Sequence, residues 1–291
     1  MKIGVVTVTY NSHHVMAEFL HSVFSQTYTD WHLYVYDNDS KHCIQPMLAK
    51  YAATRYEFVN LDSNYGFAVS NNLAIQKALL DGCEAVLIIN NDTVFESNLF
   101  AGLVEQLDLQ RALVVVPKML HYPEKEIVWY GGGYFDPRQA QKNIHIGMGA
   151  LDDGSFDTSR WVDVAPMCCL LARREAFERI GYLDEKYFIY YEDTDWAYRA
   201  KLAGISIWYA AQCKIYHKVS SLTGGSKSRF TVYHATRGKI YFIQKFYSGG
   251  ARYYWLSRYF AGFFVGLALK RYTWYEFRVK LRAFLSTIKF C

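Results

Sequence analysis

A chain of 291 residues with 52% hydrophobic content is long enough to bury a large core and too apolar to be disordered. The net charge of +5 hides an asymmetry: residues 196–291 carry 17 Lys and Arg against one acid, whereas residues 1–195 carry 15 Lys and Arg against 26 acids. A basic tail on an acidic body predicts an anionic partner, either a membrane surface or a nucleic acid.

Cysteine usage and the first residues indicate a compartment. The six cysteines form no C-x-x-C pair, and Cys168–Cys169 lies in an apolar, strand-like run, which favours buried free thiols over a disulfide framework. The opening stretch MKIGVVTVTYN enters a strand pattern directly, with no basic leader and apolar stretch before it. We therefore expect a cytoplasmic protein without a signal peptide.

Strand and helix patterns alternate four times in the N-terminal half. β-branched apolar runs that end at turn residues predict buried strands, and each is followed by an amphipathic helical pattern. This order predicts an α/β fold with an open, mostly parallel sheet and right-handed crossovers. The expected strands are 3–9, 33–36, 56–61, 85–89 and 113–116, the last cut by Pro117, and the expected helices are about 15–25, 44–53, 67–80 and 98–107.

Polar residues cluster where these strands end, and ligands of such sheets bind beyond the carboxyl ends of the strands. Each cluster alone could be a turn, because Asn, Asp and Gly favour turns. No G-x-G-x-x-G or G-x-x-x-x-G-K-[ST] occurs, which counts against nicotinamide and P-loop sites. Asp37 could accept hydrogen bonds from a base or ribose, and Asp92 could hold a divalent cation together with a diphosphate or simply cap a helix. The clusters are Thr9-Tyr10-Asn11, Asp37 with Asp39, Asn64 with Gly66, and Asn91-Asp92.

Three carboxylates fall within four residues of the stretch YYEDTDWAYR, namely Glu192, Asp193 and Asp195. A loop is expected before them and a helix over 194–203, which Gly204 ends. On that helix Glu192, Asp195 and Arg199 would share one side while Asp193 points elsewhere. The cluster is interpreted either as a reactive site or as an acidic helix N-terminus with one Asp195–Arg199 pair.

The middle and the tail carry fewer signals. Residues 117–160 lack periodicity, and their aromatic residues, with Trp161, could stack on a sugar or belong to the core. Residues 259–269 are uncharged but too short for a membrane span, and the flanking cations and aromatic residues favour an interfacial segment over a helical subdomain packed on the sheet. We expect one domain over 1–230, with a nucleotide-binding half (1–117) and an acceptor half (118–230), and a membrane-associating region over 231–291.

Six ordered stretches resemble the inverting family 2 glycosyltransferases, nucleotide-sugar enzymes of the GT-A fold. The likeness is strongest to the bacterial rhamnosyltransferase-type branch and covers residues 3–221. The stretches are VTVTYNS (6–12), YDNDS (36–40), NYGFAVSNN (64–72), LIINNDT (87–93), the run from VDVAPMCC to YRAKLAG (162–204) and KIYHKVSS (214–221).

The resemblance implies a role for each matching residue. Asp193 would be the catalytic base, supported by Glu192, Asp195 and Arg199. Asp92 is the acid kept from the family's D-x-D motif, and with His217 it would bind Mn²⁺ or Mg²⁺. Residues 220–225 would form a flexible loop that closes over the donor. Trp161 and Met167 would lie on the acceptor side, where Pro166 departs from the family's usual Gly-Ala-x-Met. The donor would be bound by Thr9, Tyr10, Asn11, Asp37, Asp39, Asn64, Gly66, Asn71 and Asn91.

The chemistry needs one base. A diphosphate leaving group that a metal neutralises needs no general acid, so one carboxylate and one displacement imply inversion at the anomeric carbon. The resemblance implies a dTDP-rhamnose donor, with UDP-hexoses next. Membrane association of the C-terminal region would be consistent with a lipid-linked glycan acceptor at the inner face of the membrane. The expected role is in cell-surface polysaccharide synthesis such as O-antigen, capsule or lipopolysaccharide.

Two rival functions stay open. A sugar nucleotidyltransferase would need a Gly-rich basic loop after the first strand, and TYNSHHV has neither Gly nor Lys. A non-catalytic membrane- or nucleic-acid-binding protein on a degenerate transferase fold would suit the basic tail. No RNA-binding motif is visible, so no nucleic acid is expected. The joint presence of Asp37, Asp92, Asp193 and His217 also counts against degeneration.

Overall fold

A mixed sheet lies at the centre of the molecule, with the order β10-β12-β6-β11-β4-β1-β2-β3. A computed structural model describes residues 1–219, 225 and 227–288. β5 pairs with β12, β7 pairs with β6, and β8 and β9 form a separate hairpin. The strands are β1 (Ile3–Thr9), β2 (Trp31–Asp37), β3 (Tyr56–Asn60), β4 (Ala85–Ile89), β5 (Thr93–Phe95), β6 (Val114–His121), β7 (Val128–Tyr130), β8 (Gly133–Asp136), β9 (Lys142–His145), β10 (Arg160–Val162), β11 (Cys169–Arg173) and β12 (Ile207–His217).

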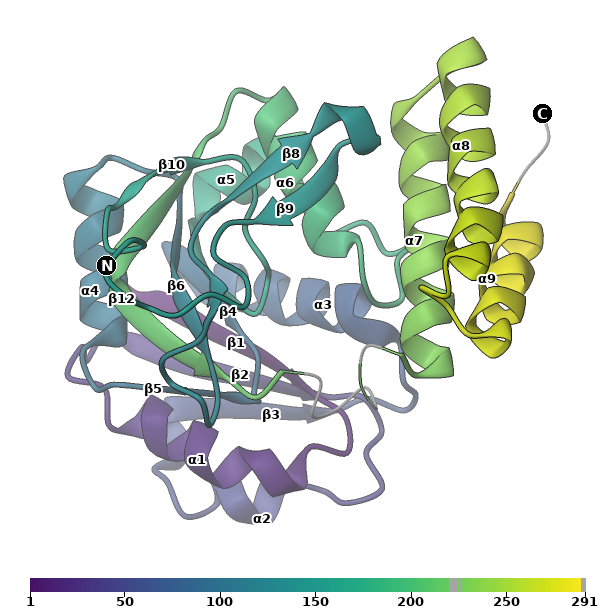
Figure 1. Cartoon of the computed structure of the whole chain (residues 1–291). Coiled ribbons are helices and arrows are strands. Elements are labelled where there is room, and N and C mark those ends of the chain that lie inside the picture. Colours follow the sequence, from purple (N-terminus) through teal and green to yellow (C-terminus); the bar gives the residue numbers. More distant parts are fainter. Residues whose placement is uncertain (220–224, 226, 289–291) are drawn as a thin grey trace.

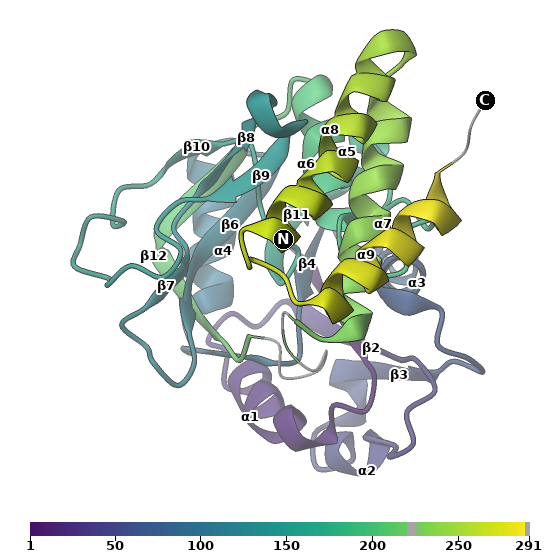
Figure 2. The ribbon, with the colours of Figure 1, turned by 45° about the vertical axis from the view of Figure 1, so that its right-hand side comes forward.

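Six helices accompany the sheet, and α7, α8 and α9 stand side by side at one end of the described molecule (Figures 1 and 2). Short 3₁₀ turns at Ala53–Arg55 and Pro137–Gln139 complete the helical elements of the described residues. The helices are α1 (His13–Phe24), α2 (Gln45–Leu48), α3 (Gly66–Leu80), α4 (Leu99–Leu109), α5 (Arg174–Ile180), α6 (Glu192–Leu202), α7 (Arg229–Phe246), α8 (Gly249–Ala268) and α9 (Trp274–Thr287).

The predicted parallel half of the sheet is confirmed. β1 pairs in parallel with β2 and β4, and β2 pairs in parallel with β3. β11, which contains Cys169, runs antiparallel between β4 and β6. The carboxyl ends of β1, β2 and β4 therefore meet at one edge, where their polar residues come together.

Two predicted boundaries are wrong. Pro117 does not end its strand: β6 continues to His121, because the partner β12 shifts register between Ala210 and Lys214, beside the proline. A bulge at this point removes the need for the ladder hydrogen bond that proline cannot donate. α2 covers four residues rather than ten, and among these residues Leu48 is the buried one.

Four cysteines among the described residues are free and buried, as expected, while Cys43 is free and exposed. Cys291 lies outside the described residues, and so does the predicted loop at 220–225 except for Gly225. Residues 117–160, which lack periodicity, form the short strands β7, β8 and β9.

The buried apolar residues form two clusters. The larger spans Ile3 to Ile215 on both faces of the sheet, and the smaller joins α7, α8 and α9 through Ile240, Phe263 and Phe284. Within the described residues, no helix combines the length and the apolar character that crossing a membrane requires. The division of the chain into two domains near residue 230 stays a prediction.

Candidate active site

A cavity of about 580 Å³ opens at the carboxyl edge of the sheet. The ends of β1, β4 and β12 form its floor, and the first residues of α3 and α6 and Phe230 of α7 form its walls. Ten of the predicted site residues line it: Thr9, Tyr10, Asn64, Gly66, Asn91, Asp92, Met167, Glu192, Asp193 and His217. The other predicted residues do not line it: Asn11, Asp37, Asp39, Asn71, Trp161, Asp195 and Arg199.

Asp37 supports the cavity wall from behind. Its buried carboxylate accepts hydrogen bonds from the Thr9 hydroxyl at 2.5 Å and from the Ser40 backbone N–H at 2.7 Å. Asn11, with φ of 51°, donates its backbone N–H to the Ser40 hydroxyl at 2.7 Å. These bonds join the ends of β1 and β2, so a linked polar network backs this side of the cavity. Asp39 also has a positive φ, of 59°.

The start of α3 is locked to the loop before α6. The Phe67 backbone N–H donates to the Phe188 carbonyl at 2.7 Å. A Cβ at Gly66, where φ is +85°, would lie 2.4 Å from that carbonyl oxygen, so the close approach requires glycine. Asn71 donates its side-chain amide to the Phe67 carbonyl at 2.9 Å and steadies the same turn. The start of α3 is thereby coupled to the loop that leads into α6.

Asp92 and His217 form a buried pair at the base of the cavity, with Nε2 of His217 3.2 Å from Oδ1 of Asp92. Burial alone would lower the pKa of His217, but Cys168 and Asp92 outweigh it and raise the pKa to about 10. The Trp129 ring packs edge-on against the imidazole, with centroids 4.7 Å apart.

One carboxylate and one imidazole make a ligand set that fits a divalent cation, provided that His217 gives up the proton that its raised pKa favours and that other oxygens complete the coordination. No group of three or more His, Cys, Asp or Glu residues suited to a metal occurs among the described residues. The pair alone would leave the coordination of a metal incomplete, so further oxygen ligands would have to come from a bound ligand. The Asn91 side chain, which donates to the Val8 carbonyl at 2.7 Å, holds the adjacent turn.

Glu192 and Asp193 face the cavity together from the first turn of α6. Burial raises the pKa of both carboxyls, and the charge of Asp193 raises the pKa of Glu192 further. The Thr194 backbone N–H donates to Asp193 at 2.5 Å, which favours the ionised form of Asp193. This bond opposes the rise for Asp193, so Asp193 loses its proton before Glu192 does and is the group of the pair better placed to accept one.

The predicted grouping of side chains on α6 is wrong. The helix begins at Glu192, two residues earlier than expected, so Glu192 and Asp193 both border the cavity. Asp195 turns away and is fully buried, with Arg199 at 2.7 Å and Lys245 at 2.6 Å. The expected Asp195–Arg199 pair is confirmed, and it anchors α6 to α7 through Lys245.

Helix α7 packs directly behind the acidic residues. Tyr190 and Tyr191 lead into α6 with φ of 66° and 76°, a conformation that is rare for tyrosine. A Cβ at Gly238 would lie 2.9 Å from the Tyr191 Cβ. Next to it, Lys239 donates to the carbonyls of Gln139 and Ala140 at 3.0 and 2.8 Å, and burial with Lys142 nearby lowers its pKa to about 7. An isolated glycine inside a helical pattern is the sequence signal for such a contact.

The predictions about aromatic residues in the cavity were less accurate. Trp161 lies on β10, half exposed, edge-on to Trp208, and does not line the cavity. Phe188 and Phe230, which were not singled out, do line it. Trp129, one of the proposed stacking residues, also faces it.

Comparison with known proteins identifies relatives. The family model for glycosyl transferase family 2 matches residues 4–181. A low-salt glycan biosynthesis hexosyltransferase, Agl10 of Haloferax volcanii, is 26% identical over 54% of this chain and 49% of its own length. The dTDP-rhamnosyl transferase RfbF of Shigella flexneri is 25% identical over 64% of this chain and 59% of its own length. The chain therefore spans about half to three fifths of these two relatives. The N-acetylglucosaminyl-diphospho-decaprenol L-rhamnosyltransferase of Mycobacterium tuberculosis is 24% identical over 79% of this chain and 80% of its own length.

Solved structures confirm the GT-A fold. GalNAc-T7 with UDP, GalNAc and Mn²⁺ superposes with a TM-score of 0.67 at 17% identity, over 89% of this chain and 51% of that one. Residues 1–349 of TarS from S. aureus superpose with a TM-score of 0.60 at 17% identity, over 99% of this chain and 81% of that one. At this identity the likeness establishes the fold alone.

Proposed function

The chain belongs to glycosyl transferase family 2, and from that membership we propose that it is an inverting glycosyltransferase that moves a sugar from a nucleotide-diphosphate donor to a hydroxyl of a glycan acceptor. The observation that carries the proposal is the shared cavity, which brings the Asp193 carboxylate and the Asp92–His217 pair to one edge of the sheet. This reaction needs a general base for the acceptor hydroxyl and a site that binds the diphosphate of the donor.

Asp193 is the proposed base. Its carboxylate would take the proton of the attacking hydroxyl as the sugar leaves the diphosphate on the opposite side, so the anomeric configuration inverts. Glu192, protonated next to it, would donate a hydrogen bond to the acceptor without competing for the proton. Asp195 and Arg199 would hold α6 in place from behind, through the bonds to Lys245 and to the Ile180 carbonyl.

Asp92 and His217 would hold Mn²⁺ or Mg²⁺, which neutralises the charge that develops on the leaving diphosphate. GalNAc-T7, which shares the fold, has been solved with UDP and Mn²⁺. Thr9, Tyr10 and Asn64 would contact the nucleoside and diphosphate, with Asp37 fixing Thr9. For this donor we propose dTDP-rhamnose, which the similarity to RfbF supports, and a UDP-hexose as the next choice.

The test of this proposal is the exchange Asp193→Asn, with Asp153→Asn in an exposed loop as the matched control. The base contributes about 10²–10⁴-fold to the rate, so Asp193→Asn should lose transfer by that factor and keep the nucleotide-dependent rise in melting temperature. The control should keep both. Transfer by Asp193→Asn at near wild-type rate would remove the proposed base.

We also propose that the acceptor is lipid-linked and that the protein binds the inner face of the membrane peripherally. One relative is named for a diphospho-decaprenol acceptor. Exposed apolar residues follow one side of α8, where Tyr254, Phe264, Val265 and Leu269 are each 50–57% exposed. Trp274 continues this surface on α9. We call it the α8 face; Arg258, Lys270 and Arg271 beside it are also exposed, and such cations favour anionic lipid.

Sedimentation with vesicles tests this part separately. Vesicles with anionic lipid should carry down the wild type, and a Phe264→Ser, Leu269→Ser variant should stay in solution. Leu80→Ser, which removes an exposed leucine at the end of α3, is the control and should sediment like the wild type. Equal sedimentation of the double variant and the control would remove the α8 face as the membrane contact.

A further inference from the structure

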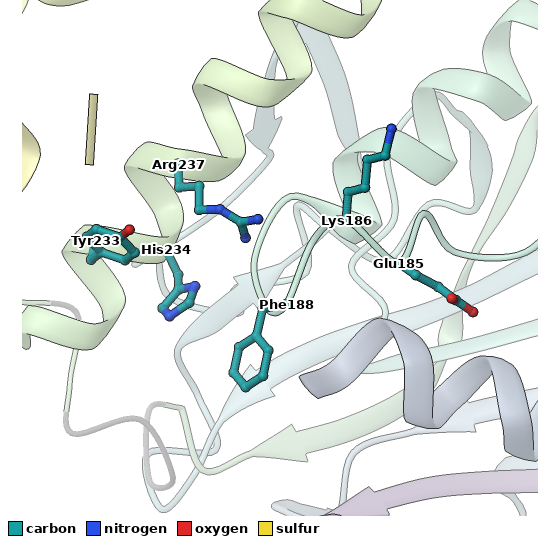
Figure 3. Close-up of a pocket in the computed structure, with 6 residues that line it drawn as sticks. All are labelled: Glu185, Lys186, Phe188, Tyr233, His234 and Arg237. Carbon is teal, nitrogen blue, oxygen red and sulfur yellow. The ribbon is translucent and has the colours of Figure 1, made fainter. Parts of the chain in front are cut away.

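A second cavity, of about 420 Å³, lies between the loop before α6 and helix α7. Figure 3 shows its six lining residues: Glu185, Lys186, Phe188, Tyr233, His234 and Arg237. Phe188 also lines the larger cavity that contains Asp193, so its side chain forms part of the wall of both cavities. We call this second space the α7 pocket. Because it borders the site that holds Asp193, a ligand in it would be a neighbour of the reacting sugars.

Two cations of the α7 pocket lack a carboxylate partner in the part of the chain that the structure describes. Neither Lys186 nor Arg237 makes an ion pair with any described residue, and the Lys186 ammonium lies 5.6 Å above the Tyr241 ring. Lys245, about two turns further along α7 than Arg237, is by contrast held by Asp184 at 2.7 Å and Asp195 at 2.6 Å. Together with Arg199, Lys245 balances the charges of Asp184 and Asp195. The lining of the α7 pocket therefore keeps two cations, Lys186 and Arg237, against one carboxylate, Glu185.

The other polar side chains of the lining do not neutralise the positive charge of Lys186 and Arg237. Glu185, the carboxylate of the lining, accepts a hydrogen bond from the Asn72 side chain at 3.0 Å, and Figure 3 shows it extending away from Arg237 and His234. Burial and the adjacent Arg237 lower the pKa of His234, so its ring is neutral and can donate one hydrogen bond. The Arg237 guanidinium extends toward the loop (Figure 3).

The walls of the α7 pocket are held in place. The Phe188 carbonyl accepts the Phe67 backbone N–H, and the preceding Tyr187 is buried with its hydroxyl 3.2 Å from Asp195. The Phe188 ring packs against His234, with centroids 5.2 Å apart. A fixed pocket with a free guanidinium, an ammonium and a neutral imidazole presents the donors that phosphate oxygens take.

The pocket also leads toward the C-terminal helices. The Tyr233 hydroxyl lies 3.3 Å from the Ser286 hydroxyl on α9, next to Leu285, which is 64% exposed. An apolar chain attached to a phosphate in the pocket could leave over α9, on the part of the molecule that carries the α8 face. We propose that the α7 pocket binds the phosphate or diphosphate of the lipid-linked acceptor, and thereby orients the acceptor glycan toward Asp193. This proposal rests on the glycosyltransferase function proposed above.

The probe is geranyl diphosphate, a short lipid diphosphate, with inorganic pyrophosphate as the free-phosphate arm. Calorimetry on the full chain in EDTA keeps the metal-dependent diphosphate position at Asp92 out of the measurement. Geranyl diphosphate should bind the wild type and bind Arg237→Gln at least about tenfold more weakly, since a hydrogen bond to a charged group is lost. The control Arg111→Gln, at the far end of α4, removes the same charge and should bind as the wild type does.

The outcomes separate the two proposals. Arg237→Gln should keep the nucleotide-dependent rise in melting temperature. If the wild type shows this rise and Arg237→Gln does not, the pocket is part of the donor site and this inference is overturned. If the wild type shows no nucleotide response, the proposed function fails, while weakened lipid diphosphate binding by Arg237→Gln would still establish the pocket.

Equal binding of geranyl diphosphate by Arg237→Gln and Arg111→Gln would overturn the inference, as would pyrophosphate binding as tight as that of the lipid. Should Arg237→Gln unfold, Lys186→Gln on the exposed loop takes its place, with the same expected loss and the same contradicting result.

Discussion

Gly238 connects the C-terminal helices to catalysis, and its replacement by alanine tests that connection. In an unhindered helix this exchange stabilises by about 1 kcal/mol. At Gly238 the new Cβ would lie 2.9 Å from the Cβ and Cδ2 of Tyr191 and 3.0 Å from the Tyr190 carbonyl oxygen. Carbon atoms prefer separations of about 3.5–4.0 Å, so α7 or the Tyr190–Tyr191 segment must move by about 0.5–1 Å.

The movement falls on the residues that lead into α6 and to Asp193, the proposed base. Overpacking costs about 1–3 kcal/mol, so Gly238→Ala should be no more stable than the wild type or less stable by up to about 2 kcal/mol. Because Asp193 follows two residues after Tyr191, a displacement near 1 Å should lower the turnover rate by up to about 10²-fold. Donor binding should be unchanged, since the residues proposed to contact the nucleoside lie at the ends of β1 and β2, away from α7.

The assay is donor-dependent transfer with parallel urea denaturation. Gly262→Ala is the matched control, because a Cβ at this α8 position meets no atom within 4 Å, and it should be stabilising and fully active. If Gly238→Ala gains stability like the control and keeps wild-type turnover, the reasoning that α7 positions the acidic residues is wrong.

Three further predictions concern charge. Since burial raises the pKa of Asp193, the rate of transfer should increase with pH through a midpoint above the ordinary aspartate range. Glu192→Gln should keep this rise in rate, because Glu192 is protonated while Asp193 titrates. A pH–rate profile of this variant without the rise would contradict the assignment. The lowered pKa of Lys239 means that the unfolded chain binds the extra proton above about pH 7, so the free energy of unfolding should rise toward about pH 9.5 more steeply in the wild type than in Lys239→Met, as measured by denaturation at several pH values. Lys118 is fully buried between Asp152 and Asp157, so Lys118→Ala should destabilise by about 3 kcal/mol in urea denaturation, whereas Asp157→Ala at the exposed end should cost under about 1 kcal/mol.

The sequence predicted the elements whose signal is local. β1, β4 and α3 have apolar runs or periodic patterns bounded by turn residues, and they form within two residues of the predicted bounds. The gathering of Thr9, Asn64 and Asp92 at one edge followed from topology alone, because parallel strands end together. Their individual roles in binding remain predictions.

What the sequence missed depends on distant packing. Pro117 continues a strand because β12 bulges beside it, a property of a segment some ninety residues away. Asp195 turns from the cavity because Lys245 on α7 pairs with it. Phe230 reaches the cavity because the first turn of α7 packs against Phe188 in the loop before α6. Such partners have no fixed spacing in the sequence, so no periodicity reveals them.

The most direct test of the central claim is a thermal shift with nucleotides and their sugars in Mn²⁺ or Mg²⁺. UDP, dTDP, GDP and their sugars are screened, and a ligand at about 100 times its dissociation constant stabilises by about 2.7 kcal/mol, a rise of roughly 5 °C or more. We predict a metal-dependent rise with dTDP or UDP compounds that Asp92→Ala abolishes and Asp153→Ala retains. A folded wild type that responds to none of these nucleotides, with or without metal, would contradict the account.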